Sequence, residues 1–524
     1  MTEGRARVAR VRLRTAAKPN SPGSALKPST GLLRVEEKRV LWVLGTGILI
    51  AVLFPSPVIK FTLAGVLGTF LFWLFMTDLP LALCLLPIII PANTLFEGTF
   101  NILPGVNYET LLIALVVVAW SSQRGAWRPF EPAKPMPAFV GLLIAFLVVL
   151  ILASAQTFAL GTPPIFELVQ IYKNQWIYVV LLFVVADALR QERERQRLMV
   201  AVCIAMILLA IQPIYNATYE LARGASLLRH RAVSLIAIQP NIYGGALACF
   251  MPFPLLYFAR KIGGKKGRVL FGLSAGVAGY VLVLTLSRGS WLATGAASLM
   301  IGVLFERRVL LILVLVGLSA PFWVPEDAVD RASEMKAIDV NDPNLKEDEG
   351  SAFVRVDQWR MIPSVLVDSP IFGHGYQRFP WVYKRFGAYG WYKGAHVGYA
   401  EYAAEAGMIG LFFYLSIFVA LAAFGLRLAW SGTSAYSRAH GVGLLGSAVA
   451  MAVAEGFGSR LKVGSVTAFL WMYAAVGIAC WRWPAGEAEE AGAVERERRG
   501  LVRRRRGSAP SAANQRFSRV PGGE

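Results

Sequence analysis

Three basic side chains stand next to long apolar segments of this 524-residue chain, in settings where they can do chemistry. Arg288 lies in "TLSRGSWL", Arg231 in "RHRAVSL" and His396 in "GAHVGYAEYAAEAG". Paired guanidinium groups bind a diphosphate bidentately and stabilise it as a leaving group. A neutral imidazole can take the proton of an attacking hydroxyl. If one face of the molecule collects these residues, they predict group transfer from a diphosphate to a hydroxyl.

Each of these residues also has a purely structural explanation. An arginine at a helix end can anchor the helix to lipid headgroups, and the basic group at 229–231 can bind lipid phosphate. A lone histidine is more often a packing residue. Gly289 leaves the guanidinium of Arg288 uncrowded, which favours a ligand role for that arginine. Whether Arg229 or Arg231 would bind the diphosphate stays open.

The composition predicts that membrane helices position these residues. Hydrophobic residues make up 56% of the chain and charged residues 16%, and the mean hydropathy is +0.51, outside the range of ordinary soluble domains. Segments of about 20 apolar residues recur, each long enough to cross a hydrocarbon core of roughly 30 Å as a helix. Lipid cannot form hydrogen bonds with unpaired backbone N–H and C=O groups, so the expected fold is an all-α, polytopic transmembrane bundle.

The apolar pattern gives fourteen candidate spans, or twelve if short and proline-containing segments are discounted. They divide the chain into a basic N-terminal tail at 1–38, helices at 39–323, a large external loop at 324–406, helices at 407–482 and a basic, disordered C-terminal tail at 483–524. The candidate spans are 39–54, 60–77, 79–96, 108–121, 136–155, 172–188, 198–215, 237–258, 269–286, 291–305, 308–323, 407–428, 441–457 and 464–482.

The placement of charge predicts which side of the membrane each connection faces. Of the 53 Lys and Arg residues, ten lie in 1–39 and ten in 482–524, and the connections "RQERERQR" and "RKIGGKKGR" fall on the same side as both tails. The positive-inside rule puts this side in the cytoplasm. The net charge of +20 therefore indicates retention signals that touch anionic lipid, with no nucleic acid as partner. The first apolar segment begins near Val40, too late for a cleaved signal peptide.

The same assignment of the connections to the two sides of the membrane puts the candidate residues on one external face. In the long loop, residues 326–349 are acidic and are expected to be flexible. Residues 353–369 predict an interfacial helix, interrupted by Pro363, whose apolar face holds Trp359, Ile362, Val365 and Leu366. Residues 376–393 carry eight aromatic and four basic residues, a mixture that suits sugar rings.

Five more residues are candidates for substrate binding. Asn241 belongs to a "QPN" sequence whose backbone donors can support an anion site at a helix start. Glu405 lies in a first helical turn and is also explained as a partner of the helix dipole. Arg229, Arg355 and Arg378 complete the set. Together these features predict glycosyl transfer from a lipid diphosphate outside the cytoplasm, and the scattered single cysteines predict neither a disulfide framework nor a zinc site.

Three segments in this order resemble the signatures of the O-antigen ligase and Wzy-type polymerase superfamily: "LTLSRGSWLA", "RVDQWRMIPSVLVDSPIFGHGYQRF" and "AHVGYAEYAAEAGMIGLFFYL". The resemblance covers about residues 228–428. It implies a GT-C-like, multi-pass enzyme of the bacterial inner membrane that moves a glycan from undecaprenyl diphosphate to an acceptor on the periplasmic side, without metal or nucleotide. Arg288 and Arg231 would hold the diphosphate, and His396 would act as base. Val397 departs from the asparagine that often follows this histidine.

The resemblance leaves the acceptor open. A polymerase adds the glycan to another lipid-linked repeat unit, with a flippase and a chain-length regulator as expected partners, whereas a ligase adds it to the lipid A core. The aromatic, basic loop favours the polymerase of a secreted or surface polysaccharide. A flippase or transporter is the alternative of another class; it predicts charges in the middle of spans and an internal repeat. A structural scaffold has no need for external arginines in tight turns.

Overall fold

A computed structural model describes seven stretches of the chain: residues 57–91, 108–127, 134–160, 165–224, 239–333, 347–387 and 394–484. The chain divides into two compact units, Met1–Leu53 and Phe54–Glu524, and every described residue belongs to the second. Within the described stretches the regular structure is helical and contains no strand. The expected all-α membrane bundle is confirmed.

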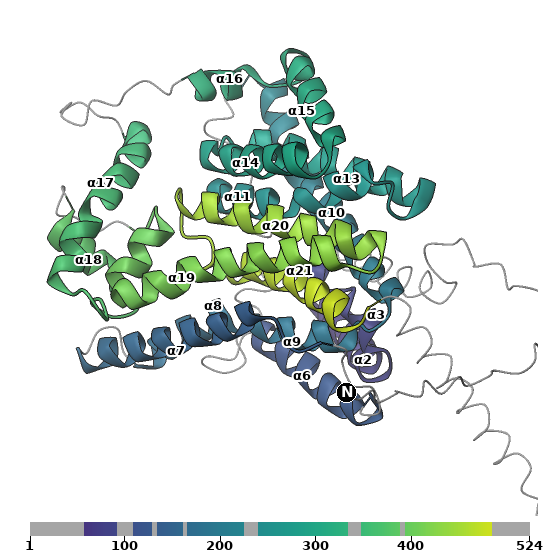
Figure 1. Cartoon of the computed structure of the whole chain (residues 1–524), viewed down its shortest axis with the longest axis horizontal. Helices are drawn as coiled ribbons and strands as arrows, with labels where there is room; N and C mark the ends of the chain where they lie inside the picture. The colour runs from purple at the N-terminus through teal and green to yellow at the C-terminus, as the bar shows by residue number, and fades with distance from the viewer. Residues whose placement is uncertain are drawn as a thin grey trace, which may run out of the picture. The chain divides into compact units, whose positions relative to one another are not determined.

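Figure 1 shows the arrangement of the helices. Their bounds are α2 Pro57–Thr77, α3 Leu79–Leu83, α4 Leu86–Ile89, α6 Tyr108–Trp127, α7 Ala138–Ala159, α8 Ile165–Trp176, α9 Val179–Ala188, α10 Glu192–Ala222, α11 Pro240–Phe250, α12 Pro252–Ala259, α13 Gly264–Leu284, α14 Arg288–Leu304, α15 Arg307–Ser319, the 3₁₀ helix η1 Ala320–Phe322, α16 Glu326–Ser333, α17 Glu347–Asp368, α18 Phe379–Phe386, α19 Gly398–Ser431, α20 Ala435–Glu455 and α21 Gly464–Arg482.

Six of the described helical segments are long and apolar enough to cross a membrane, and a bent pair at the end of α15 makes a possible seventh. Other expected spans are broken into shorter helices, such as α8 and α9 in place of the span at 172–188. The expected first span at 39–54 and the two basic tails lie outside the described residues. The chain is thus a multi-pass membrane protein.

Two helical segments form the centre of the bundle and differ from those around them. Other parts of the protein bury 89% of the most apolar 18-residue stretch of α21 and 83% of that stretch in the α11–α12 segment. In α7 the corresponding share is 33%. A helix that is apolar all round belongs inside, whereas α7 keeps a wide surface for lipid. Helices α19 and α20 lie side by side in Figure 1, and their backbones meet closely at Gly425 and Gly441. Small residues permit this approach.

A cap of two helices, α17 and α18, packs on the start of α19. Its core contains Val354 and Val365 of α17, Val382 of α18 and Ala404 of α19. The expected apolar face of this segment is confirmed in part, since Val365 is buried and Ile362 packs against the core. Trp359 is instead 45% exposed, while the polar Asp357 and Gln358 are buried with the core side. Both polar side chains have hydrogen-bond partners inside the cap, and these bonds offset the free-energy cost of removing the side chains from water. The helix also continues through Pro363 instead of stopping there.

Helix α19 begins nine residues before the expected span, and it contains a break at Gly407. This residue has φ 63° and ψ −158°, a conformation open essentially to glycine alone. The break lets the turn at 371–373 dock against the helix, where Met408 N donates to Pro370 O over 2.8 Å. The expected boundary between loop and helices, at 406/407, therefore falls on this break inside one helix.

The break predicts a large effect for Gly407→Ala. A Cβ at this position would lie 2.5 Å from Ile371 O and 2.6 Å from Gly373 N, so backbone would have to move in addition to the strain of about 1–3 kcal/mol. We expect a clear fall in the thermal unfolding temperature of the detergent-purified protein. Gly276→Ala in α13 is the matched control, since nothing lies within 4 Å of its Cβ position. Equal unfolding temperatures for the two variants would contradict the observed backbone.

Candidate anion site and proton-transfer site

Three helices, α11, α14 and α17, lie around the loop between α20 and α21. The first turn of α14 lies so close to this loop that a Cβ on Gly289 would meet the side chain of Phe457. The carbonyl of Phe457 accepts a 3.1 Å hydrogen bond from Arg355 Nε of α17. Ser290 Oγ donates to the Asn241 carbonyl at the start of α11, over 3.4 Å. The loop therefore connects three sequence-predicted residues, Asn241, Arg288 and Arg355.

The arginines gathered here form one concentrated positive region. Burial, together with repulsion from Arg460, Arg288 and Arg331, lowers the pKa of Arg355 to about 10. Such mutual repulsion is unfavourable until an anion enters and neutralises it. The region, made of Arg288, Arg355 and Arg460 with Arg331 at its side, is called the arginine site below.

Arg460 is the member of the arginine site that the sequence reasoning missed. It is 1% exposed, and its Nη1 donates to the carbonyls of Ala454 and Gly458, the second over 2.8 Å. Its Nε and Nη2 have no hydrogen-bond partner among the described residues. A buried guanidinium with two unused donors is costly unless a ligand completes it. The available signal was "GSRLKVGS", a connection expected on the external side that carries two cations against the positive-inside rule.

Two helix starts add positive potential beside these side chains. Helix α14 begins at Arg288 itself, and α11 begins at Pro240, just before Asn241. Neither helix has a side-chain cap, so their first backbone N–H groups are not bonded by the side chains of Ser287 and Gln239. Uncapped helix starts favour anions through their N–H groups and the helix dipole. The expected external turn at 287–290 is thus mainly the first turn of a helix.

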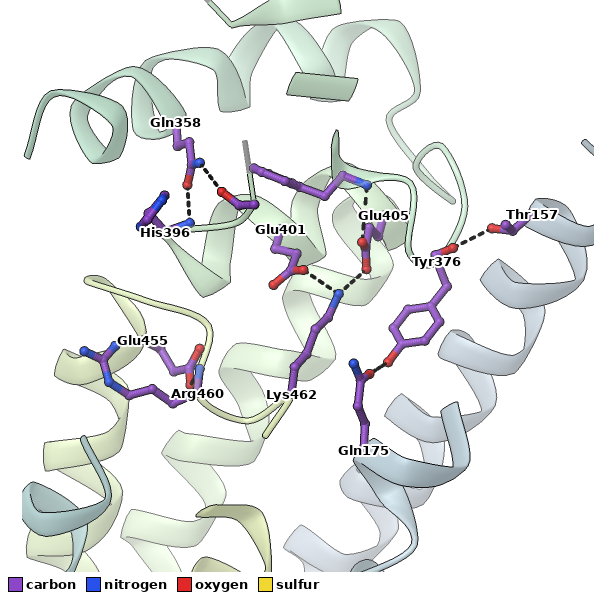
Figure 2. Close-up of polar contacts among 12 residues, drawn as sticks. Thr157, Gln175, Gln358, Tyr376, His396, Glu401, Glu405, Glu455, Arg460 and Lys462 are labelled. Carbon is purple, nitrogen blue, oxygen red and sulfur yellow. Dashed lines mark hydrogen bonds and ion pairs between the residues drawn. The ribbon is translucent and has the colours of Figure 1, made fainter. Parts of the chain in front are cut away.

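A buried ion triad joins the same loop to α19. Lys462 Nζ lies 2.6 Å from Glu401 Oε1 and 2.6 Å from Glu405 Oε2, and Figure 2 shows the lysine between the two carboxylates. The three side chains are 9%, 10% and 1% exposed. Although burial opposes it, attraction to both carboxylates raises the pKa of Lys462 above its ordinary value. The triad fixes the loop that carries Arg460 to the start of α19.

Glu405, a sequence-predicted candidate for substrate binding, is also bound on the other side of its carboxylate. Its second carboxylate oxygen, Oε1, accepts from the backbone N of Phe379 over 3.3 Å, and its carbonyl accepts from Gly375 N over 3.0 Å. Both carboxylate oxygens are thus occupied inside the protein. Glu405 positions the turn before α18 and the loop that carries Lys462.

The turn ahead of α18 is also tied to the opposite side of the bundle through Tyr376. The Tyr376 carbonyl accepts from Thr157 Oγ1 of α7 over 2.8 Å, and its hydroxyl accepts from Trp176 Nε1 of α8 over 3.1 Å. The hydroxyl itself donates to Gln175 Oε1, as Figure 2 shows. These contacts hold the cap on α7, α8 and α19 at once.

His396 stands directly before α19, where the cap fixes its backbone. Gln358 Oε1 accepts from His396 N over 2.8 Å, and Gln358 Nε2 donates to Gly394 O over 3.1 Å, so one buried amide holds two sides of the loop (Figure 2). At the first residue of α19, Gly398 packs against Glu455 too closely to allow a Cβ. Glu455 Oε1 in turn accepts from Arg460 N over 2.8 Å. The histidine loop and the arginine site are therefore braced by the same residues.

The structure brings together part of the predicted site. Asn241, Arg288 and Arg355 meet around one loop, and His396 lies on a loop braced through Glu455 to Arg460. Arg378 lines a separate cavity beside α18. Arg229 and Arg231 lie outside the described residues. Within the described stretches, no group of three or more His, Cys, Asp or Glu side chains is arranged to hold a metal ion. Arginines can bind an anionic leaving group, and a half-buried histidine can accept a proton.

The comparison with known families agrees with the motif order along the chain. Residues 273–415 match the family model described as O-antigen ligase. The matched region runs from α13 into the first half of α19, so it includes Arg288, Arg355 and His396. Arg460 and Lys462 follow it. A search of curated proteins found no match.

Proposed function

Because the chain is a member of the O-antigen ligase and polymerase family, we propose that it is a glycosyltransferase that uses a glycan linked to undecaprenyl diphosphate. The acceptor is a second lipid-linked repeat unit, and the product is a lengthened surface or secreted polysaccharide. The arginine site carries this proposal: three buried or half-buried guanidinium groups and two helix starts without a side-chain cap lie around one loop, and two guanidinium nitrogens of the buried Arg460 have no hydrogen-bond partner among the described residues.

In the proposed reaction, Arg288, Arg355 and Arg460 bind the diphosphate and neutralise the charge that grows on it. The acceptor hydroxyl attacks the anomeric carbon of the donor sugar and forms the new carbon–oxygen bond. The bond from that carbon to the diphosphate breaks, and its electron pair leaves with the diphosphate oxygen. His396 takes the hydroxyl proton. Charge stabilisation by fixed donors is commonly the largest single contribution to such transfers.

Two other functions give different products. An O-antigen ligase would transfer the same glycan once, to the lipid A core, and would give no ladder of lengths. A flippase or transporter of lipid-linked oligosaccharide would bind the donor without releasing undecaprenyl diphosphate. The convergence of a proton acceptor with the arginine site favours transfer over transport, since transport needs no base.

His396→Ala tests the proton-transfer step. We expect the rate of glycan transfer to fall by about 10²–10⁴-fold, the usual contribution of a general base, while donor binding is kept. Purified wild-type and variant proteins would be incubated with an undecaprenyl-diphosphate repeat unit, and product length followed on gels. Arg307→Ala, which changes an exposed residue at the start of α15, is the control and should transfer glycan at the wild-type rate. Unchanged transfer by His396→Ala would remove the histidine from the mechanism.

A labelling experiment tests the proposed periplasmic position of the cap. Lys384 of α18 and Lys265 at the start of α13 are both exposed, and the proposed topology puts them on opposite sides of the membrane. We expect an impermeant maleimide added to spheroplasts to label Lys384→Cys and to spare Lys265→Cys until the membrane is opened. The reverse pattern would overturn the proposed orientation. Three of the four native cysteines are buried, which keeps the background low.

A further inference from the structure

A second polar cavity, of about 310 Å³, lies beside α18 and away from the residues of the arginine site. It is bordered by the C-terminal end of α7, the end of α17, the turn at 373–374 and α18. Its polar and aromatic lining includes Gln156, Asp368, His374, Arg378, Trp381 and Arg385. The volume lies at the lower end of the range of small-molecule sites. We call it the α18 cavity.

One wall of the α18 cavity is a fixed ion group. Asp368 Oδ2 lies 2.9 Å from His374 Nε2, and Arg385 donates to both oxygens of Asp368, over 3.1 Å and 2.7 Å. The hydrogen bond to His374 lowers the pKa of Asp368, and Arg385 lowers it further against a modest effect of burial. The carboxylate is therefore ionised at neutral pH. Bound carboxylate and guanidinium groups of this kind offer acceptors and donors to sugar hydroxyls.

Arg378 supplies a positive charge that this ion group does not balance. Its guanidinium has no hydrogen bond or ion pair with any described residue. Asp368 pairs with Arg385, so Arg378 remains in excess on the cavity wall. The ring of Trp381, in a side chain that is 45% exposed, lies on the same wall. An aromatic face beside hydrogen-bonding groups suits the flat, apolar face of a sugar ring.

We propose that the α18 cavity binds an acidic sugar of the glycan chain, with Arg378 holding its carboxylate, Trp381 packing on its ring and the Asp368–Arg385 pair binding its hydroxyls. The inference rests on the proposed function for the presence of a glycan. Asp368 disfavours a phosphate headgroup, which would bring only negative charge towards it, whereas a sugar brings hydroxyl donors.

The position of the cavity makes it a subsite for the chain and not for the reacting bond. His374 N donates to Ala404 O over 2.9 Å, six residues after α19 begins at Gly398, a rise of about 9 Å along the helix. His396 lies two residues before the start of α19, so about this distance along the helix separates the histidine from the cavity. A sugar in the cavity therefore belongs to a neighbouring unit of the same glycan, and the cavity selects glycans that carry an acidic residue.

Calorimetric titration of the full-length protein in nanodiscs of zwitterionic lipid tests the inference. The probes are trigalacturonate, an acidic trisaccharide, and maltotriose, a neutral one. We expect trigalacturonate to bind at least about tenfold more tightly than maltotriose, and Arg378→Gln to remove this difference. Lys384→Gln is the matched control: it lies on the same helix, is exposed, does not line the cavity, and should bind like wild type. Arg378→Lys keeps the charge and should keep part of the preference.

Three results would overturn the inference. The first is equal binding of the two trisaccharides to the wild type, and the second is an unchanged preference in a folded Arg378→Gln protein. The third is tight binding of soluble dihexanoyl phosphatidylglycerol that displaces trigalacturonate and is lost in Arg378→Gln, which would assign the cavity to a lipid headgroup. Glycan transfer measured on the same samples separates the two proposals. Transfer without preferential binding rejects the α18 cavity alone, and binding without transfer rejects the proposed function alone.

Discussion

Arg288→Ala is expected to lower the rate of glycan transfer by about 10²–10³-fold, the usual loss when one fixed donor to a developing negative charge is removed. Arg288 opens α14, so its side chain and the uncapped helix start act on the same region. The remaining arginines, Arg355 and Arg460, would still bind the donor, which places most of the loss in kcat and less in KM. Steady-state kinetics with an undecaprenyl-diphosphate repeat unit measure both constants.

Two further variants make this result specific. Arg288→Lys keeps the charge but loses the planar fork that binds a phosphate bidentately, so we expect an intermediate rate. Arg307→Ala changes an exposed arginine just past the opposite end of α14, and its rate should equal that of the wild type. If Arg288→Ala and Arg307→Ala transferred glycan equally fast, Arg288 would be only an anchor for the helix.

The second large effect is expected for Lys462→Met. This change leaves the carboxylates of Glu401 and Glu405 buried without their cation, and breaking a buried ion pair in this way costs about 3–5 kcal/mol. The thermal unfolding temperature should fall, and glycan transfer should fall with it because the loop that carries Arg460 is released. Since protonation removes the uncompensated charge, the unfolding temperature of the variant should rise as the pH falls from about 8 to about 5.

The triple variant Lys462→Met, Glu401→Gln, Glu405→Gln is the control for this interpretation. It removes all three charges together and keeps side chains of similar volume, so most of the lost stability should return. The dependence on pH should disappear at the same time. A triple variant as unstable as Lys462→Met would mean that the lysine acts through its packing on Tyr376 and Tyr402 and not through the ion triad.

The spans could be predicted from sequence because hydropathy is a local property. Each long apolar segment within the described stretches is helical, and the start of α11 at the "QPN" sequence follows from the proline. The buried face of α17 could not be found in the same way, because the argument assumes that polar residues point outward. Asp357 and Gln358 are buried instead, since Tyr383 and the backbone near His396 satisfy them.

The sequence predicted the residues of the candidate site that belong to local motifs, but it did not predict the others. Arg288, Arg355 and His396 belong to motifs with a recognisable order, whereas Lys462 acts through Glu401 and Glu405, 61 and 57 residues away in the chain. No local pattern reveals such partners. The break at Gly407 could not be predicted either. The sequence contains the glycine, but its positive φ depends on the docking of the turn at 371–373 against the helix.

The release of undecaprenyl diphosphate tests the central claim most directly. Wild-type protein would be given a radiolabelled undecaprenyl-diphosphate repeat unit with no other acceptor, and the freed lipid diphosphate and the glycan products would be quantified together. The account predicts one lipid diphosphate released for each new glycosidic bond and a ladder of lengthening glycans, with both products formed about 10²–10³-fold more slowly by Arg288→Ala. Donor that stays intact while it binds or crosses the membrane would contradict the account and identify a transporter.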